Sequence, residues 1–370
     1  MERPHARRLG ARLASGVALA LVAALALTLP AAAWSKDWTK PKLVFKYAPP
    51  PTHDTAVDSA GKTHIATERG SGGIWYVTNV SGSWTKCQIS SGNDREPSIA
   101  TAGGVVHIAF ARRSGDTRGL YTASSDQETG GEGCGWTPTR RQDGPVSHPS
   151  MEAFGSTLSI AFRTGGGKLR FTRGASGDPS WTMLETIDGK CCTSMPSLAL
   201  TTTGAPRVAY GDGTKKAEGL KYAVRTGSGW KKSKAAKGRV KQVTMVLDKS
   251  PGVFTPPSNA PRIAFVINKK GTYYAAKGSS GARGRWFVDF YGRGFARPGI
   301  RVWSNDELIL VGRGGKYWYS VKRAAIRFGY TLTTSGRDIK MILAGQPGGI
   351  DVVTFARKKG TKGIYFSRRK

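Results

Sequence analysis

The chain has 370 residues, a formal net charge of +33 at neutral pH and a hydrophobic content of 39%. Its five histidines and four cysteines are too few and too scattered to form a zinc site, and no second long apolar stretch follows the one near the N-terminus. We therefore expect neither a bound metal, nor a cofactor, nor a membrane span in the body of the protein, whereas the charge favours an anionic partner.

The first 33 residues have the pattern of a secretory signal peptide. Four arginines precede an apolar run from Val17 to Leu29, which ends in Pro30 and the small residues Ala31-Ala32-Ala33. The alternative is a membrane anchor, but the run is shorter than the ~20 apolar residues that span a bilayer. The pattern predicts cleavage near Ala33 and a secreted, extracellular protein that consists of residues 34–370.

A short apolar strand recurs along the rest of the chain. Ile65 in the first copy and Val353 in the seventh are six repeats apart, which gives a mean period of 48 residues. Repeats of this length are typical of β-propeller blades, which have four strands each. The seven copies are His64-Ile65-Ala66, His107-Ile108-Ala109-Phe110, Ser159-Ile160-Ala161-Phe162, Arg207-Val208-Ala209-Tyr210, Arg262-Ile263-Ala264-Phe265, Leu308-Ile309-Leu310-Val311 and Val352-Val353-Thr354-Phe355.

Three further strands accompany this recurring strand in most copies. One precedes it and often opens on Pro-Ser, one rich in aromatic residues follows it, and one opens on tryptophan, with Tyr330-Thr331 in that place in the sixth copy. The seventh copy ends at Lys370 without a tryptophan strand, while the segment from Trp38 to Tyr47 has that pattern and precedes the first repeat. We therefore predict an all-β fold: a single seven-bladed β-propeller over residues 34–370, closed by an N-terminal strand that completes the last blade.

The repeats resemble the sialidase-like (BNR or Asp-box) superfamily of β-propellers. The Asp-box turn before the outer strand is present in degenerate forms at Ser81-Gly82-Ser83-Trp84, Ser124-Ser125-Asp126 and Ser228-Gly229-Trp230. For a sialidase the resemblance implies six blades, a Phe-Arg-Ile-Pro start, three arginines that hold a carboxylate, an acidic proton donor and a tyrosine nucleophile. This chain differs in its seven repeats and its lack of the Phe-Arg-Ile-Pro sequence.

The positive charge is concentrated in the C-terminal half. Residues 34–214 hold 19 basic and 16 acidic residues, whereas residues 215–370 hold 34 basic and 7 acidic ones. Because consecutive blades are neighbours, this excess should form one basic sector over blades 4 to 7, which would attract an acidic polysaccharide or another polyanion, including a cell wall or an anionic surface. The alternative is a generally basic surface that only aids solubility. A monomer is expected.

Loops that enter the inner strands and loops that follow the second strands share one face of a propeller. Arginines predicted to line this mouth, and to bind a carboxylate or phosphate, are Arg95, Arg112, Arg163, Arg297, Arg313 and Arg357. Catalytic candidates are Glu96, His148 and Tyr291, with Asp94 as a further acid and His53 as a further base. For each candidate the alternative is a loop residue that binds only backbone.

The four cysteines of an exported chain predict disulfides. Of the three pairings that are open, the one favoured joins Cys87 to Cys134 on neighbouring outer strands and Cys191 to Cys192 in a loop.

The function favoured by these patterns is a secreted β-propeller that binds an anionic polymer or acidic glycan through its basic sector and arginine-lined mouth. Two alternatives stay open. One is an enzyme, either a sialidase-like glycoside hydrolase or a uronate polysaccharide lyase, and the other is an extracellular protein-interaction scaffold.

Overall fold

In the computed structural model, described residues are 38–46, 52–70, 72–125, 135–178, 181, 183–214, 218–249, 259–277, 285–292, 296–303, 306–313, 316–323, 326–333, 338–345, 351–357 and 361–370. Side chains at 292, 296–297, 303, 306–308, 310–313, 316–323, 326–333, 338–343, 345 and 356–357 are outside this description. The predicted signal peptide, residues 1–33, also lies outside it. No helix among the described residues is long and apolar enough to cross a membrane.

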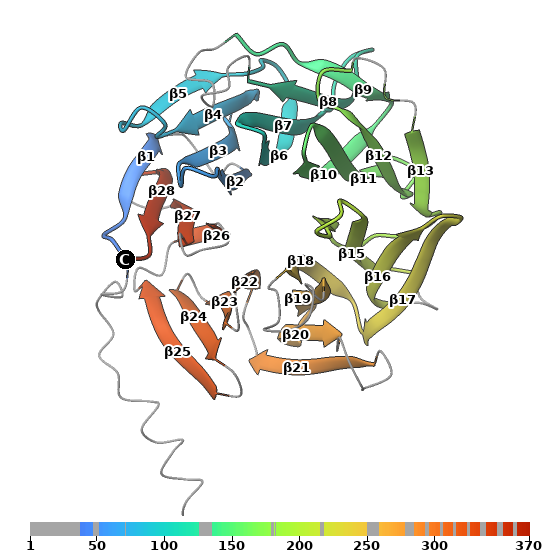
Figure 1. Cartoon of the computed structure of the whole chain (residues 1–370), viewed down its shortest axis with the longest axis vertical. Helices are drawn as coiled ribbons and strands as arrows, with labels where there is room; N and C mark the ends of the chain where they lie inside the picture. The colour runs from blue at the N-terminus through green and yellow to red at the C-terminus, as the bar shows by residue number, and fades with distance from the viewer. Residues whose placement is uncertain are drawn as a thin grey trace, which may run out of the picture. The chain divides into compact units, whose positions relative to one another are not determined.

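The described residues form seven antiparallel sheets of four strands each (Figure 1). We number the sheets in chain order and call their strands first to fourth. The first strands are β2 (His53–Val57), β6 (Asp94–Ala102), β10 (Val146–Phe154), β14 (Ser197–Leu200), β18 (Val240–Asp248), β22 (Ala296–Trp303) and β26 (Asp338–Gly345). The second strands are β3 (Thr63–Glu68), β7 (Val105–Arg112), β11 (Thr157–Thr164), β15 (Pro206–Asp212), β19 (Ala260–Ile267), β23 (Asp306–Arg313) and β27 (Asp351–Arg357).

The remaining strands lie further from the first strand of each sheet. The third strands are β4 (Ile74–Thr78), β8 (Gly119–Ser124), β12 (Leu169–Ala175), β16 (Gly219–Thr226), β20 (Gly271–Lys277), β24 (Lys316–Arg323) and β28 (Gly363–Arg368). The fourth strands are β5 (Thr85–Gln88), β9 (Thr139–Asp143), β13 (Met183–Asp188), β17 (Gly229–Lys237), β21 (Trp286–Gly292), β25 (Ile326–Thr333) and, in the seventh sheet, β1 (Lys42–Lys46). The recurring apolar segment of the sequence is thus the second strand of every sheet.

Strand β1 comes from the start of the described chain but belongs to the seventh sheet. It pairs antiparallel with β28, with Leu43 opposite Tyr365 and Lys46 opposite Gly363. Trp38 extends this pairing through a bridge to Arg369, and its side chain is buried. Figure 1 shows β1 beside β28, although the two are about 320 residues apart in the chain. The last sheet therefore obtains its fourth strand from the N-terminal side.

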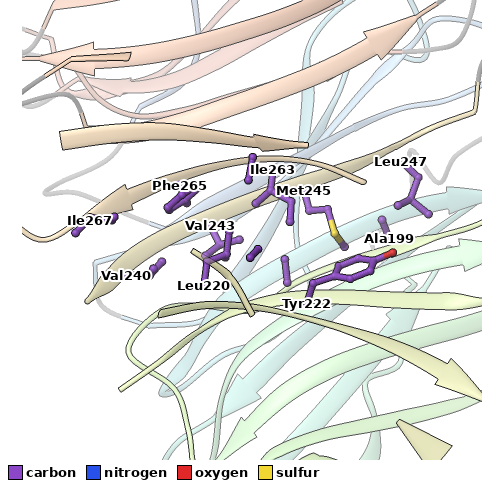
Figure 2. Close-up of a cluster of buried hydrophobic side chains, with 13 residues drawn as sticks. Ala199, Leu220, Tyr222, Val240, Val243, Met245, Leu247, Ile263, Phe265 and Ile267 are labelled. Carbon is purple, nitrogen blue, oxygen red and sulfur yellow. The ribbon is translucent and has the colours of Figure 1, made fainter. Parts of the chain in front are cut away.

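The first strands are the inner strands, because each contacts the first strand of the next sheet. These contacts run β2–β6–β10–β14–β18–β22–β26, and β26 in turn contacts β2. Apolar side chains fill the space between adjacent sheets. Figure 2 shows the cluster between the fourth and fifth sheets, where Leu220 and Tyr222 pack against Met245, Ile263 and Phe265. Burying a side chain such as Phe265 contributes roughly 1.5–3 kcal/mol.

The vicinal pair Cys191–Cys192 is disulfide-bonded, which confirms that part of the predicted pairing. It lies between β13 and β14, where Cys192 is buried among Leu169, Ile187 and Leu198. Cys87 is also disulfide-bonded, and its predicted partner Cys134 lies outside the described residues.

Candidate functional site

Backbone bulges shape the start of several inner strands. In β6 and β10 the register shifts between Arg95 and Ser98 and between Ser147 and Ser150, so Glu96-Pro97 and His148-Pro149 occupy the bulges. Glu96 and His148 have φ values of 56° and 54°, in the left-handed region that residues other than glycine seldom adopt. Such backbone outliers persist where the surroundings over-determine them, often at functional sites. The two bulges bring the two side chains together from neighbouring sheets.

The carboxylate of Glu96 is the centre of this cluster, which we call the bulge site. Its Oε1 lies 2.8 Å from Nδ1 of His148 and 2.6 Å from a guanidinium nitrogen of Arg113, while Oε2 accepts from the backbone N–H of His148 at 2.8 Å. Burial acts to raise the pKa of Glu96, but these hydrogen bonds and charges outweigh it and lower the pKa to about 2. Glu96 is therefore ionised at neutral pH and cannot act as a proton donor there.

Glu68 links the bulge site to the first sheet. Its Oε2 accepts from the backbone N–H of Glu96 at 2.9 Å and its Oε1 accepts from the backbone N–H of Thr52 at 3.0 Å. Glu68 and Arg113 stand at or just after the ends of second strands, whereas Glu96 and His148 stand near the starts of inner strands. The two kinds of loop predicted to share a face therefore do meet here.

His148 is oriented for proton transfer. An ionised carboxylate beside Nδ1 favours the tautomer in which Nδ1 carries the proton and Nε2 carries the lone pair. Among the described residues Nε2 has no hydrogen-bond partner, and the side chain is 29% exposed. The arrangement can therefore remove a proton from a bound molecule, or hold a hydroxyl group or an anion.

Three of the six arginines predicted to bind ligand have described side chains. Arg112 donates through Nε and a terminal nitrogen to Asp94, at 2.8 and 2.9 Å, and lies 4.2 Å from the ring centre of Tyr121. Asp94 is fully buried, so the guanidinium of Arg112 is engaged in a structural ion pair and is not available to hold a ligand. Arg95 donates to the side chain of Asn93 at 3.1 Å.

Arg163 is half-buried at the end of β11, opposite Ser147, and forms no ion pair with the described residues. Its backbone is therefore adjacent to the bulge of β10, and its guanidinium is not engaged in an ion pair with the described residues. Arg297, Arg313 and Arg357 belong by backbone to β22, β23 and β27, but their side chains lie outside the described set.

Tyr291 and His53 are placed apart from the bulge site. Tyr291 lies in β21, the outermost strand of the fifth sheet, and packs edge-on to Tyr274 with ring centres 6.4 Å apart. His53 opens β2, is buried, and lines the central cavity described next. Glu96 and His148 are thus the only two of the three catalytic candidates that the structure brings into contact.

A cavity of about 440 Å³ lies between the inner strands, and all seven of them line it. Its wall carries the charged residues Asp54, Glu152, Lys241 and Arg301. Glu152 and Arg301 were not identified from sequence patterns. Among the described residues, no group of three or more His, Cys, Asp or Glu side chains could hold a metal ion.

Comparison with known proteins identifies a fold and no closer relationship. No family model and no curated protein matches the sequence. Among solved structures, a polysaccharide lyase of an ulvan lyase family has 11% identity and a TM-score of 0.60, covering 88% of this chain and 93% of its own. YCF48, in a structure with bound D1 peptide, has 13% identity and a TM-score of 0.56, covering 91% and 98%.

A sialidase mutant from Trypanosoma rangeli that displays trans-sialidase activity has 11% identity and a TM-score of 0.50, covering 91% of this chain and 60% of its own. At such identities the likeness concerns the fold alone. The antiparallel four-stranded sheets and these neighbours agree on an all-β architecture of the β-propeller kind, and two of the three neighbours are carbohydrate-active.

Proposed function

We propose that this protein is a secreted, seven-bladed β-propeller of sialidase-like ancestry that binds an acidic glycan or a similar anionic polymer. The ring is supported by the circular contacts of the inner strands and by the pairing of β1 with β28. Closure of this kind removes exposed sheet edges. The degenerate Asp-box turn at 81–84 lies between β4 and β5, and the one at 228–230 continues into the start of β17.

The observation that carries the proposal is the uneven charge together with its exposure. The C-terminal 156 residues hold 34 basic and 7 acidic residues. On β17 the side chains of Lys231, Lys232, Lys234 and Lys237 are all exposed, and only Lys232 has an acidic neighbour among the described residues, Asp188 at 3.7 Å. Unpaired lysines on a strand surface attract a polyanion without needing a shaped pocket.

The test is retention on immobilised polygalacturonate, with dextran as the neutral polymer, across a salt series. We expect retention on polygalacturonate that declines with salt. The triple variant Lys231→Gln, Lys234→Gln, Lys237→Gln should bind on the order of tenfold more weakly, since three exposed ionic contacts contribute about 0.5 kcal/mol each. The matched control, Lys86→Gln, Lys168→Gln, Lys190→Gln, removes three exposed lysines from the less basic half and should bind nearly as the native protein does.

Equal loss of retention in both triple variants would show that the lysines act through the overall charge of the protein and not as one basic sector. Absence of retention on any acidic polymer at low salt would refute the proposal. Tight, salt-resistant partners recovered instead would favour the scaffold function.

The bulge site supports a second candidate, cleavage of a uronate polymer by elimination. His148 Nε2 would take the proton next to the carboxyl group, the bond to the leaving oxygen would break as the double bond forms, and that oxygen would be protonated by water. The side chain of Arg163 would neutralise the uronate carboxylate. Native protein incubated with polygalacturonate should then release products that absorb ultraviolet light. His148→Asn should release none, whereas Lys86→Gln should match the native protein, and no release by the native protein would exclude this activity on that polymer.

Export can be tested separately. The mature protein recovered from the medium should begin at Trp34, and retention inside the cell would contradict the predicted signal peptide.

A further inference from the structure

The sheet register aligns one residue from each inner strand. Each lies opposite the first residue of the recurring second-strand segment: Ala56 opposite His64, Ala100 opposite His107, Glu152 opposite Ser159, Ala199 opposite Arg207, Val246 opposite Arg262, Arg301 opposite Leu308, and Ala344 opposite Val352. We call these seven positions the inner ring. All of them except Ala199 line the central cavity.

The composition of the inner ring is unusual. Four positions are alanine and one is valine, so small apolar side chains leave space between the inner strands. The other two are Glu152 in the third sheet and Arg301 in the sixth. If the inner ring served only to fill the centre of the fold, we would expect apolar side chains at all seven positions, because buried charges cost free energy unless they are paired. Two long charged side chains instead line a cavity of about 440 Å³.

Neither charged group is satisfied by direct contact with the described protein. Glu152 and Arg301 form no hydrogen bond or ion pair with another described residue, and Nε of Arg301 is buried without a partner. The charges influence one another at longer range. Burial and, to a lesser extent, Asp54 raise the pKa of Glu152 to about 7, against the lowering effects of Lys249 and Arg301. Burial lowers the pKa of Arg301, which Asp351 and Glu152 counteract.

A buried guanidinium nitrogen without a partner costs free energy unless water or a ligand meets it. Arg301 presents a planar fork that matches a carboxylate, whereas Glu152 can accept from, or when protonated donate to, a hydroxyl group. The alanines between them leave room for a polyhydroxylated molecule. The cavity volume lies in the range of small-ligand sites.

We infer that Glu152 and Arg301 form a binding site for a single acidic sugar residue, with its carboxylate on Arg301 and a hydroxyl group on Glu152. The inference rests on the proposed function and deepens it, because it names a shaped site in addition to the basic surface. This site is separate from the bulge site. Glu152 lies four residues after His148 on the same strand, which is about 13 Å at 3.3 Å per residue.

The test measures binding of glucuronate to the purified protein by calorimetry, with glucose and acetate as probes that lack the carboxylate and the hydroxyl groups, respectively. Arg301→Ala should fold, because it installs the residue that four other sheets already have at this position. It should weaken glucuronate binding at least tenfold, and Arg301→Lys should weaken it too, because lysine lacks the bidentate fork. Arg118→Ala removes an exposed arginine that does not line the cavity and is the matched control.

Selective binding of glucuronate that is lost in Arg301→Ala and kept in Arg118→Ala supports the inference. Three results overturn it: no glucuronate binding by the native protein, equal binding of acetate, or unchanged binding by a folded Arg301→Ala variant. Retention on polygalacturonate is measured on the same samples. If the protein is retained on polygalacturonate but does not bind glucuronate, the inner-ring site is refuted and binding through the basic surface is supported. If the protein shows neither retention nor glucuronate binding, the proposed function is refuted as well.

Discussion

The hydroxyl of Ser98 in the second sheet accepts a hydrogen bond from the backbone N–H of Met151 in the third, at 3.0 Å, and itself donates to the carboxylate of Asp54 in the first, also at 3.0 Å. The same tie recurs further along the chain. Ser150 accepts from the N–H of Leu198 at 3.0 Å, and Ser197 accepts from the N–H of Met245 at 2.9 Å. The serines of these three Pro-Ser segments therefore bind the inner strands of the second, third and fourth sheets to the sheet that follows.

This relationship predicts the effect of removing one hydroxyl. Ser98→Ala leaves the N–H of Met151 and one oxygen of Asp54 without that partner in a buried setting, which costs about 1–3 kcal/mol of the free energy of unfolding. Urea denaturation measures this loss. Ser81→Ala, in an exposed turn, should change stability by less than about 0.5 kcal/mol. Equal effects in the two variants would show that the Ser98 tie contributes nothing specific.

Much of the architecture can be read from the sequence because burial imposes it on every repeat. The second strand is buried between neighbouring sheets, so its apolar pattern recurs each time, and Trp38 marks the extra strand before the first repeat. The pairing of Cys191 with Cys192 was also predicted, as one of three pairings open to the four cysteines.

Side-chain partners were harder to predict because they depend on register. Arg112 was expected to bind ligand, but it stands directly opposite Asp94 in the β6–β7 pairing, which is set by a bulge that no sequence pattern locates. The inner ring depends on similar bulges in β10 and β22. Glu152 and Arg301 become visible only when the inner strands are aligned through the second strands. In the sequence, an alignment of Met151-Glu152 with Ile99-Ala100 would have shown that Glu152 occupies a position that is alanine in the preceding repeat.

The ion pairs of Glu96 predict an acid-sensitive contribution to stability. Its pKa is lowered from 4.5 to about 2 in the folded protein. The contribution is therefore fully present above pH ~4.5 and is lost as pH falls towards ~2, and the shift corresponds to about 3 kcal/mol. Glu96→Gln should thus be less stable than the native protein at pH 7, and the difference should narrow as the pH falls through this range.

Urea denaturation at a series of pH values checks this prediction. Asp143→Asn is the control, because its carboxylate is 78% exposed and, among the described residues, forms an ion pair with Arg140 alone. A constant difference between Glu96→Gln and the native protein down to pH 2 would show that the carboxylate charge is not what stabilises the bulge site.

His107 predicts a separate pH effect at milder acidity. Burial lowers its pKa from 6.5 to about 4, and Nδ1 lies 2.7 Å from the hydroxyl of Ser124. Below pH ~6.5 His107 is protonated in the unfolded chain but stays neutral in the folded protein. The free energy of unfolding therefore falls by about 3 kcal/mol between pH ~6.5 and ~4. In His107→Gln this part of the decline should be absent. His64, whose pKa is also lowered by burial, keeps its own contribution, so parallel curves for the two proteins would contradict the assignment to His107.

Glu152 should behave in the opposite direction to Glu96. Its pKa is raised from 4.5 to about 7, so the folded protein holds a proton that the unfolded chain has released, and the resulting stabilisation is complete below pH ~4.5 and lost as the pH rises through ~7. The native protein should therefore lose about 3 kcal/mol relative to Glu152→Gln between these limits. The charged groups that act on this carboxyl are Lys249, Asp54 and Arg301, and replacing Arg301 by alanine should extend the loss to higher pH because it removes a cation that favours the ionised form.

Glucuronate adds a further discriminating measurement to this titration. If the sugar carboxylate binds Arg301, it shields Glu152 from that cation and adds a negative charge, so the midpoint of the Glu152 transition should move to higher pH when glucuronate is present. Glucose should leave the midpoint unchanged. A midpoint that glucuronate does not move, in a protein that binds glucuronate, would place the sugar elsewhere than between Glu152 and Arg301.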